Sequence, residues 1–180
     1  VAKKDGGDAN QRRAAMAFVV ALLPAAFMWV QILHARSLPL IHDITTDTNN
    51  PPVFISPTIV GAERMNTLEY GPAEIADMQR EAYPDVQPIE ASAPPGEAFD
   101  LAITVAQSLG WEVVSEDRDN GQIEAIDTTF WFGFKDDIAI RIGAQGGGSR
   151  IDLRSISRVG LSDVGANANR IVAFIERFDN

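Results

Sequence analysis

Residues 137–157 read DIAIRIGAQGGGSRIDLRSIS, and this stretch decides the fold class. Isoleucine occupies every second position from 138 to 142, which is the pattern of a β-strand with one buried face. The glycines at 146–148 predict a turn, after which residues 150–157 form a second strand. The stretch therefore predicts an antiparallel hairpin with one face in a hydrophobic core.

The segments on either side extend this hairpin into a sheet with helices. Two further strands, at 111–116 and 122–132, flank the pair Asn120-Gly121, which suits a tight hairpin turn. Apolar spacing predicts helices at 72–83, at 95–109 and from Ser162, as N-cap, to about 178. Because four consecutive strands lie between helices, the sequence predicts an α+β fold, a four-stranded antiparallel meander with helices packed on one face.

Nearer the N-terminus, residues 14–33 read AAMAFVVALLPAAFMWVQIL and contain no charge. This run has about the length needed to cross a bilayer, so it predicts a single transmembrane helix. By the positive-inside rule the N-terminus is cytoplasmic and the later residues are outside, since four basic residues precede the run and one follows closely: Lys3, Lys4, Arg12, Arg13 and Arg36. A cleaved signal peptide and a buried helix of a soluble protein are the alternative interpretations. The first residue is Val1 rather than Met, so we expect further sequence upstream.

These features divide the chain into three parts. Residues 1–36 hold the cytoplasmic N-terminus and the membrane helix, the proline-rich residues 37–70 form an extended linker lying over the domain, and residues 71–180 form an acidic α+β domain. Residues 37–180 carry 10 basic and 23 acidic side chains, a net charge of −13. This acidity excludes nucleic acid as an expected partner.

The composition also limits the chemistry of the domain. The chain has no cysteine and two histidines, which removes thiol chemistry and most of the usual acid–base groups and metal ligands. No serine-nucleophile elbow, phosphate loop or dinucleotide fingerprint occurs. We therefore expect no cofactor, no metal and no catalytic residue.

The densest polar group surrounds the start of the last predicted helix. Its members are Arg154, Arg158, Ser162, Asp163, Asn167 and Arg170. The amide donors at a helix start, with arginines nearby, could hold a carboxylate or phosphate group. The alternative interpretation is structural: Ser162 caps the helix, Asp163 complements its dipole, and the arginines pair with acidic neighbours.

A second polar group lies in the predicted linker and consists of His42, Asp43, Thr45, Thr46 and Asp47. These side chains could support acid–base chemistry or hold a cation. Asp and Thr side chains also bond to their own backbone in turns. We expect a structural latch, formed by His42, Asp43, Thr45 and Asp47, that fixes the linker to the domain.

A third feature is the aromatic stretch TTFWFGF at 128–134. Phe130, Trp131, Phe132 and Phe134 cannot all face one side of a strand, because successive side chains alternate. If exposed, they could dock a partner protein, contact the membrane surface or line an apolar pocket. Coverage by the linker is the alternative.

Several motifs occur together along the chain: HDITTDTNNPP at 42–52, AYPDVQP at 82–88, GW at 110–111, IEA at 123–125, GFKDDIAIRI at 133–142 and RSISRVGLSDVGANANRI at 154–171. With these motifs, residues from about 40 to 178 resemble the family called domain of unknown function fourteen-ninety-nine. The resemblance implies a bacterial envelope or plastid protein, with membrane helices often preceding the domain in bacteria. It implies no activity.

The expected function follows from the membrane helix and from the lack of catalytic motifs. We expect a membrane-anchored, non-catalytic interaction protein, an accessory or assembly subunit of a membrane complex. Its partners are then the membrane and other subunits of that complex. We expect it in the bacterial inner membrane with the C-terminal domain in the periplasm. The alternative is a domain that binds or hydrolyses a small anionic ligand at the membrane surface.

Overall fold

The alternating stretch at 137–157 forms the central hairpin of the domain, strands β5 (Lys135–Gln145) and β6 (Gly148–Ser157). The structure is a computed structural model that describes residues 5–180. The two strands pair antiparallel from Asp136↔Ser157 to Gln145↔Gly148. Gly146 and Gly147 form the turn, with φ of 59° and 90°. These values lie in the left-handed region that glycine adopts at little cost.

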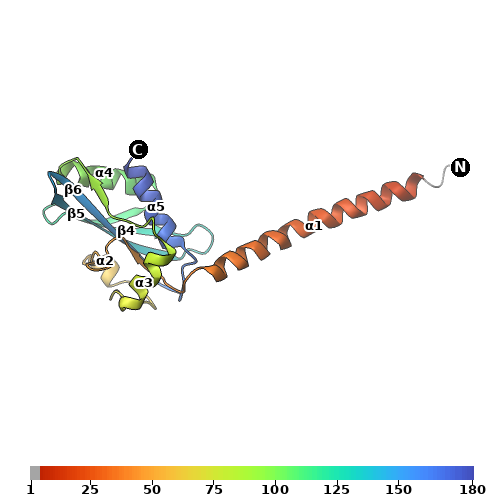
Figure 1. The fold of residues 1–180 in the computed structure, drawn as a ribbon, viewed down its shortest axis with the longest axis horizontal. Helices are drawn as coiled ribbons and strands as arrows, with labels where there is room; N and C mark the ends of the chain where they lie inside the picture. The colour runs from red at the N-terminus through yellow and green to blue at the C-terminus, as the bar shows by residue number, and fades with distance from the viewer. Residues whose placement is uncertain (1–4) are drawn as a thin grey trace. The chain divides into compact units, whose positions relative to one another are not determined.

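Six strands form one antiparallel sheet, in the order β1-β6-β5-β4-β3 with β2 also paired to β6 (Figure 1). Strands β3 (Glu112–Asp117) and β4 (Gln122–Thr128) complete the predicted meander. Strands β1 (Asp43–Thr45) and β2 (Ile89–Ala91) pair with the two ends of β6. The α+β class with an antiparallel sheet is confirmed, but the number of strands is six instead of four. The two additional strands have three residues each, too few to show an alternating pattern.

Five helices lie in the described chain. Besides the N-terminal helix they are α2 (Pro57–Val60), α3 (Ala73–Ala82), α4 (Pro95–Ser108) and α5 (Ala166–Phe178). Helix α5 begins three residues later than predicted, because its N-cap is Gly165, with φ of 82°, instead of Ser162. The strand predicted at 122–132 ends early, at Thr128, because residues 130–132 form a turn.

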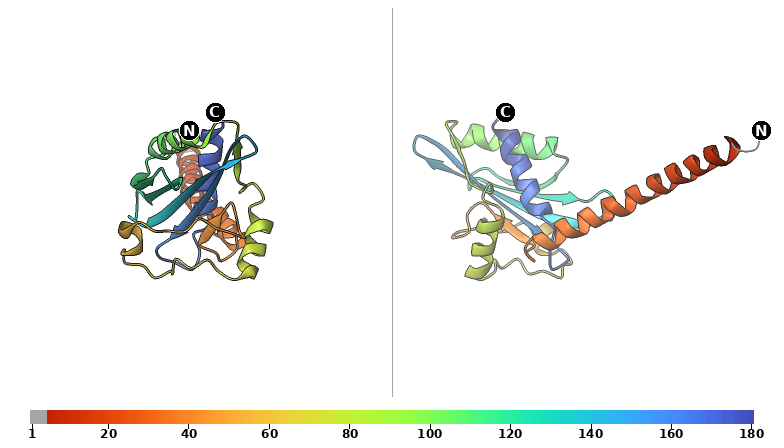
Figure 2. Two further views of the ribbon diagram at one scale, coloured as in Figure 1. Left: turned by 90° about the vertical axis from the view of Figure 1, so that its left-hand side faces the viewer. Right: turned by 45° about the vertical axis from the view of Figure 1, so that its right-hand side comes forward.

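Each face of the sheet has its own apolar cluster. On one face, Ile138, Ile140 and Leu153 pack with residues of α4 and α5, including Phe99 and Phe174. Figure 2 shows both helices on this side of the sheet. The opposite face carries a smaller cluster with these buried members: Phe54, Ile59, Ile126, Ala139 and Ile156. Strand β5 is therefore buried on both faces at its centre, whereas alternation had predicted one buried face.

The second cluster explains the position of the segment expected as an extended linker. Residues from Pro39 onward belong to the same compact unit as the rest of the domain. This segment contains β1 and α2, and it supplies Phe54 and Ile59 to the core. The sequence did not predict that this segment contributes to the core, because its short elements are separated by four prolines and give no periodic apolar signal.

The N-terminal helix, α1 (Asp5–Ser37), forms a separate unit that ends at Leu38. Its residues Asn10–Ser37 are long and apolar enough to cross a membrane, with a mean hydropathy of 2.2. A signal sequence near the N-terminus would have the same properties. Lys3 and Lys4, which contribute to the predicted orientation, lie outside the described residues.

Candidate functional site

Arg154 is the most deeply buried of the three arginines among the predicted ligand-binding residues, with 2% of its surface exposed. Its Nε and Nη2 donate to the two carboxylate oxygens of Asp43 at 2.9 and 2.7 Å. The same guanidinium donates to the carbonyl oxygens of Pro52 and Leu68. Burial raises the pKa of Asp43, and the contacts with Arg154 oppose that shift. Arg154 thus binds the N-terminal segment of the domain to β6.

Two aromatic rings complete the surroundings of Arg154. Its Cζ lies 5.2 Å from the ring centroid of Phe54 and 5.6 Å from that of Tyr70, both within cation–π range. Burial, together with the charge of Asp43, raises the pKa of Tyr70 to about 12. The guanidinium is therefore enclosed by groups of this chain.

Asn167 and Arg170 of α5 belong to a different buried network. Arg170 donates to Asp136 at 2.6 Å, to Asp127 at 2.8 Å and to Ser155 at 3.1 Å. Asn167 accepts from the Ser155 hydroxyl at 2.7 Å and donates to the His42 carbonyl at 2.9 Å. These bonds fix the first turns of α5 on the sheet and on the start of the domain.

Arg158 forms a third group with Asp137. Its Nη2 lies 2.7 Å from Asp137 Oδ1, and Arg64 donates to Asp137 Oδ2 at 3.0 Å. Asp137 is fully buried, so two guanidinium groups surround one carboxylate that water does not reach. The bonded partner, Asp137, stands in the alternating strand β5 itself.

Ser162 and Asp163 act in the loop before α5. Asp163 accepts from the amides of Gly165 at 2.9 Å and Asn167 at 2.6 Å, and burial raises its pKa. The Ser162 hydroxyl accepts from the Val164 amide at 3.2 Å and donates to the Pro39 carbonyl at 3.4 Å. The predicted anion site would use the backbone amides near this helix start. Two of these amides already donate to Asp163.

The three arginines of the predicted ligand group thus lie in separate networks, and each faces a carboxylate of this chain. An external anion would have to displace Asp43, Asp137 or Asp136 from a buried pair. Breaking a buried pair of this kind typically costs several kcal/mol. The geometry therefore favours a structural role for these cations.

The segment 42–47 is bonded to the domain along its length. The Thr45 hydroxyl donates to the Leu153 carbonyl at 2.9 Å, and the His42 carbonyl accepts from the Ser157 amide at 3.0 Å. Asp47 lies 3.2 Å from Arg141 and 3.4 Å from Arg150. These contacts hold the segment against the sheet, as the expected latch would.

Gln79 is a partner of this segment that sequence reasoning missed. Its side-chain amide accepts from the Thr45 backbone N–H at 2.9 Å and donates to the Thr45 carbonyl at 2.7 Å. It therefore satisfies both backbone groups of Thr45 on the free edge of β1, as a neighbouring strand would. The only available signal was a glutamine in a helix, which is common and unspecific.

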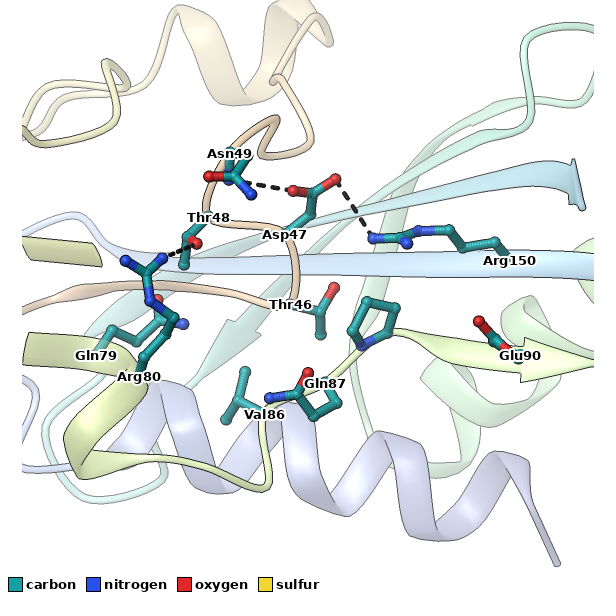
Figure 3. Close-up of a pocket in the computed structure, with 11 residues that line it drawn as sticks. Thr46, Asp47, Thr48, Asn49, Gln79, Arg80, Val86, Gln87, Glu90 and Arg150 are labelled. Carbon is teal, nitrogen blue, oxygen red and sulfur yellow. Dashed lines mark hydrogen bonds and ion pairs between the residues drawn. The ribbon is translucent and has the colours of Figure 1, made fainter. Parts of the chain in front are cut away.

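A polar groove of about 660 Å³ lies beside this latch. Figure 3 shows Arg80 and Arg150 on opposite sides of Asp47, with Asn49 and Gln87 on the walls. Arg80 Nη1 lies 2.5 Å from the Thr48 hydroxyl, and Asp47 accepts from the Asn49 amide at 3.1 Å. The two arginines and the two carboxylates on the walls, Asp47 and Glu90, balance in charge. The groove therefore has no strong preference for an anion or a cation.

The aromatic stretch forms an exposed loop between β4 and β5. Phe130, Trp131 and Phe132 are 89%, 84% and 78% exposed, and Phe134 is half exposed. Phe130 packs edge-on against Trp131 with ring centroids 5.1 Å apart, and Phe132 stacks on Phe134 at 5.7 Å. We call residues 129–134 the aromatic loop. Large aromatic side chains in contact with one another and open to water are typical of interaction sites.

Comparison with known proteins gives a family but no activity. The family model described as "Protein of unknown function (DUF1499)" matches residues 43–178. No curated protein matches the chain. Among solved structures, the crystal structure of Ara h 8.0201 aligns with a TM-score of 0.36 and 14% sequence identity, covering 52% of this chain and 96% of that chain.

Proposed function

The chain belongs to the DUF1499 family, whose function is unknown, and from that premise we propose that it is a membrane-anchored, non-catalytic interaction protein, an accessory or assembly subunit of a membrane complex. In this proposal α1 anchors the chain in the bacterial inner membrane with its N-terminus in the cytoplasm. The domain then lies in the periplasm. The basic residues Arg12 and Arg13 ahead of the apolar run support this orientation.

The exposed aromatic loop is the observation that carries the proposal. Its four aromatic side chains gather on one turn, whereas the arginines of the sequence-predicted ligand site are paired with internal carboxylates. Aromatic residues dominate the energetics of interfaces. The loop is therefore the docking surface of the domain, through Phe130, Trp131, Phe132 and Phe134.

Extraction of the full chain from native membranes with a gentle detergent, followed by size separation and mass spectrometry, tests this function. Wild-type protein should co-migrate with a larger membrane assembly in constant proportion. A variant with Phe130, Trp131 and Phe132 changed to serine should lose that co-migration. Migration of the wild-type chain as a monomer from native membranes would contradict the proposal.

A matched control separates loss of docking from loss of exposed apolar area. Val53, Ile55 and Val60 are also more than half exposed, and they lie in the segment that covers the second face of the sheet. Changing all three to serine should leave co-migration intact. If both triple variants dissociate equally, the aromatic loop has no special role.

A further inference from the structure

Four segments that are distant in sequence converge at one end of the sheet. The Ser157 amide donates to the His42 carbonyl, the Arg158 amide donates to the Lys135 carbonyl, and the Met65 amide donates to the Arg158 carbonyl. The start of the domain, residues 63–66, the aromatic loop and the loop after β6 therefore meet there. Figure 1 shows that the β4–β5 connection and the end of β6 lie at the same end of the sheet. We call this the anchored end, because the domain begins there at Pro39.

Each of these four segments carries at least one large apolar side chain that is exposed to solvent. Leu40, Met65 and Leu161 are 74%, 80% and 80% exposed, in addition to the three aromatic side chains of the loop. The stretch 128–134 contains no charged residue, and the exposed charged residue next to it is Lys135. This is unusual in a domain region whose net charge is −13.

The opposite end of the sheet exposes polar and charged side chains instead of apolar ones. The turn between β3 and β4 is formed by Arg118, Asp119 and Asn120, all exposed, and the turn between β5 and β6 follows Gln145. The two ends are separated by the length of β5, which is about 35 Å at roughly 3.3 Å per residue. Of the two ends of the sheet, the anchored end is therefore the one that exposes large apolar side chains.

Chain connectivity limits how far this end can lie from the membrane. Helix α1 ends at Ser37 and the domain begins at Pro39, so Leu38 is the only residue between them. Two peptide steps span about 7 Å at most. If α1 crosses the bilayer, as the proposed function requires, the first residue of the domain lies at the lipid headgroups.

We infer that the anchored end of the domain binds the lipid–water interface, with Phe130, Trp131 and Phe132, together with Leu40, Met65 and Leu161, inserted among the headgroups. The amphipathic ring of Trp131 favours that depth, and apolar burial draws the phenylalanine rings there without help from charge. Insertion fixes the orientation of the domain, so that its far end is directed away from the bilayer. This inference rests on the proposed membrane anchoring, and it places the aromatic loop at the lipid headgroups, where a partner subunit in the same membrane would meet it.

The three tryptophans of the chain make the insertion measurable. Trp111 is buried and stacks on Phe174 at 5.5 Å, so its emission serves as an internal reference. Trp29 lies in α1 and is removed by Trp29→Phe. The full chain carrying this change is reconstituted in phosphatidylcholine vesicles, with Trp29→Phe/Trp131→Phe as the reference spectrum. The difference between the two spectra is the emission of Trp131.

We expect the emission of Trp131 to be blue-shifted and resistant to aqueous iodide. In vesicles whose lipid is brominated near the headgroup it should lose roughly half its intensity, because interfacial side chains lie about 5–10 Å deep. A control chain places the probe at the far end, as Gln145→Trp in the Trp29→Phe/Trp131→Phe background. That tryptophan should remain open to iodide and unaffected by brominated lipid.

The outcomes distinguish this inference from the proposed function. Retention of the chain in the vesicles after alkaline washing, with Trp131 open to iodide, overturns the inference and leaves the anchor intact. Release of the chain by the alkaline wash overturns the anchor, and the inference with it. Protection of Trp131 from iodide without quenching by brominated lipid also overturns the inference, because a protein surface, such as a second copy of this chain, then covers the loop.

Discussion

The Arg154 guanidinium and the Asp43 carboxylate form a bidentate ion pair between β6 and β1, across 111 residues of sequence. Both side chains are buried, and both backbone segments pair in the sheet at the same place, Thr45↔Arg154 and Asp43↔Ile156. The pair therefore joins the first strand of the domain to the last.

Removing one member of this pair should destabilise the domain strongly. Asp43→Ala leaves the Arg154 charge buried without its carboxylate, and such a change costs about 3–5 kcal/mol. Denaturant unfolding of the full chain in detergent, followed by circular dichroism, measures the loss. The exposed pair Asp100–Arg118 is the control, and Asp100→Ala should leave the unfolding midpoint unchanged. Equal losses in the two variants would show that burial of the pair is irrelevant.

Gln79→Leu should destabilise the domain through the backbone of β1. The substitution keeps a side chain of similar size but removes the acceptor and the donor that Thr45 uses. Leaving a buried N–H and a buried carbonyl unpaired costs about 2 kcal/mol or more. The same unfolding measurement reports it, and Gln107→Leu on the exposed face of α4 is the control. A change within error at Gln79 would mean that water replaces the amide at this edge.

Glu124 should make stability depend on pH. It is fully buried, where it accepts from the amides of Ile55 and Ser56 at 2.8 and 2.9 Å, and burial raises its pKa above the ordinary 4.5. The folded state therefore holds the proton more tightly than the unfolded state, and stability falls as pH rises from 4.5 through the folded-state pKa.

The variant Glu124→Gln isolates this effect. The unfolding free energy of the wild type, relative to the variant, should be highest at acidic pH and decrease toward neutrality. Glu116→Gln, on the exposed side of β3, is the control and should follow the wild type. A constant difference between wild type and Glu124→Gln at all pH values would contradict the prediction.

Gly121 and Gly133 provide a matched test of backbone packing, because both have φ of 65°. A Cβ on Gly121 would lie 2.1 Å from the Ile142 carbonyl oxygen, whereas one on Gly133 meets nothing within 4 Å. Gly133→Ala should cost only the left-handed backbone strain, about 1–2 kcal/mol. Gly121→Ala should cost clearly more, since the contact with β5 must open. Equal unfolding free energies for the two variants would rule out the close approach.

The sequence was informative where elements are long and periodic. The meander β3 to β6 and the helices α3 and α4 follow from alternating isoleucines, from Asn120-Gly121 and from apolar spacing. Strands β1 and β2 could not be predicted, because three residues carry no period and their pairing with β6 is set by tertiary contacts. The start of α5 was predicted at Ser162, where a hydroxyl residue precedes an acidic one, but Gly165 with positive φ delays the helix.

In the candidate site, too, the sequence indicated some of the residues but not which of them are partners. Arg154 and Asp43 were both singled out, yet they were assigned to two separate groups, because nothing in a sequence indicates that positions 111 residues apart are partners. Asp136, Asp137 and Gln79 were missed for the same reason: each is an ordinary polar residue until the fold places it beside Arg170, Arg158 or Thr45. The aromatic residues at 130–134 were singled out because four bulky rings cannot share one strand face. The sequence nevertheless placed 130–132 in a strand and left open whether the linker covers the rings, and the structure places them on an exposed loop.

The pairing of β1 with β6 also determines when the domain can mature during synthesis. The first strand leaves the ribosome long before its partner, and a sheet closed over so long a loop forms late and slowly. Until Arg154 has emerged, Asp43 has no counter-ion, and Ile44 has no core to enter. The nascent domain thus has an open strand edge at β1 until β6 is available to pair with it.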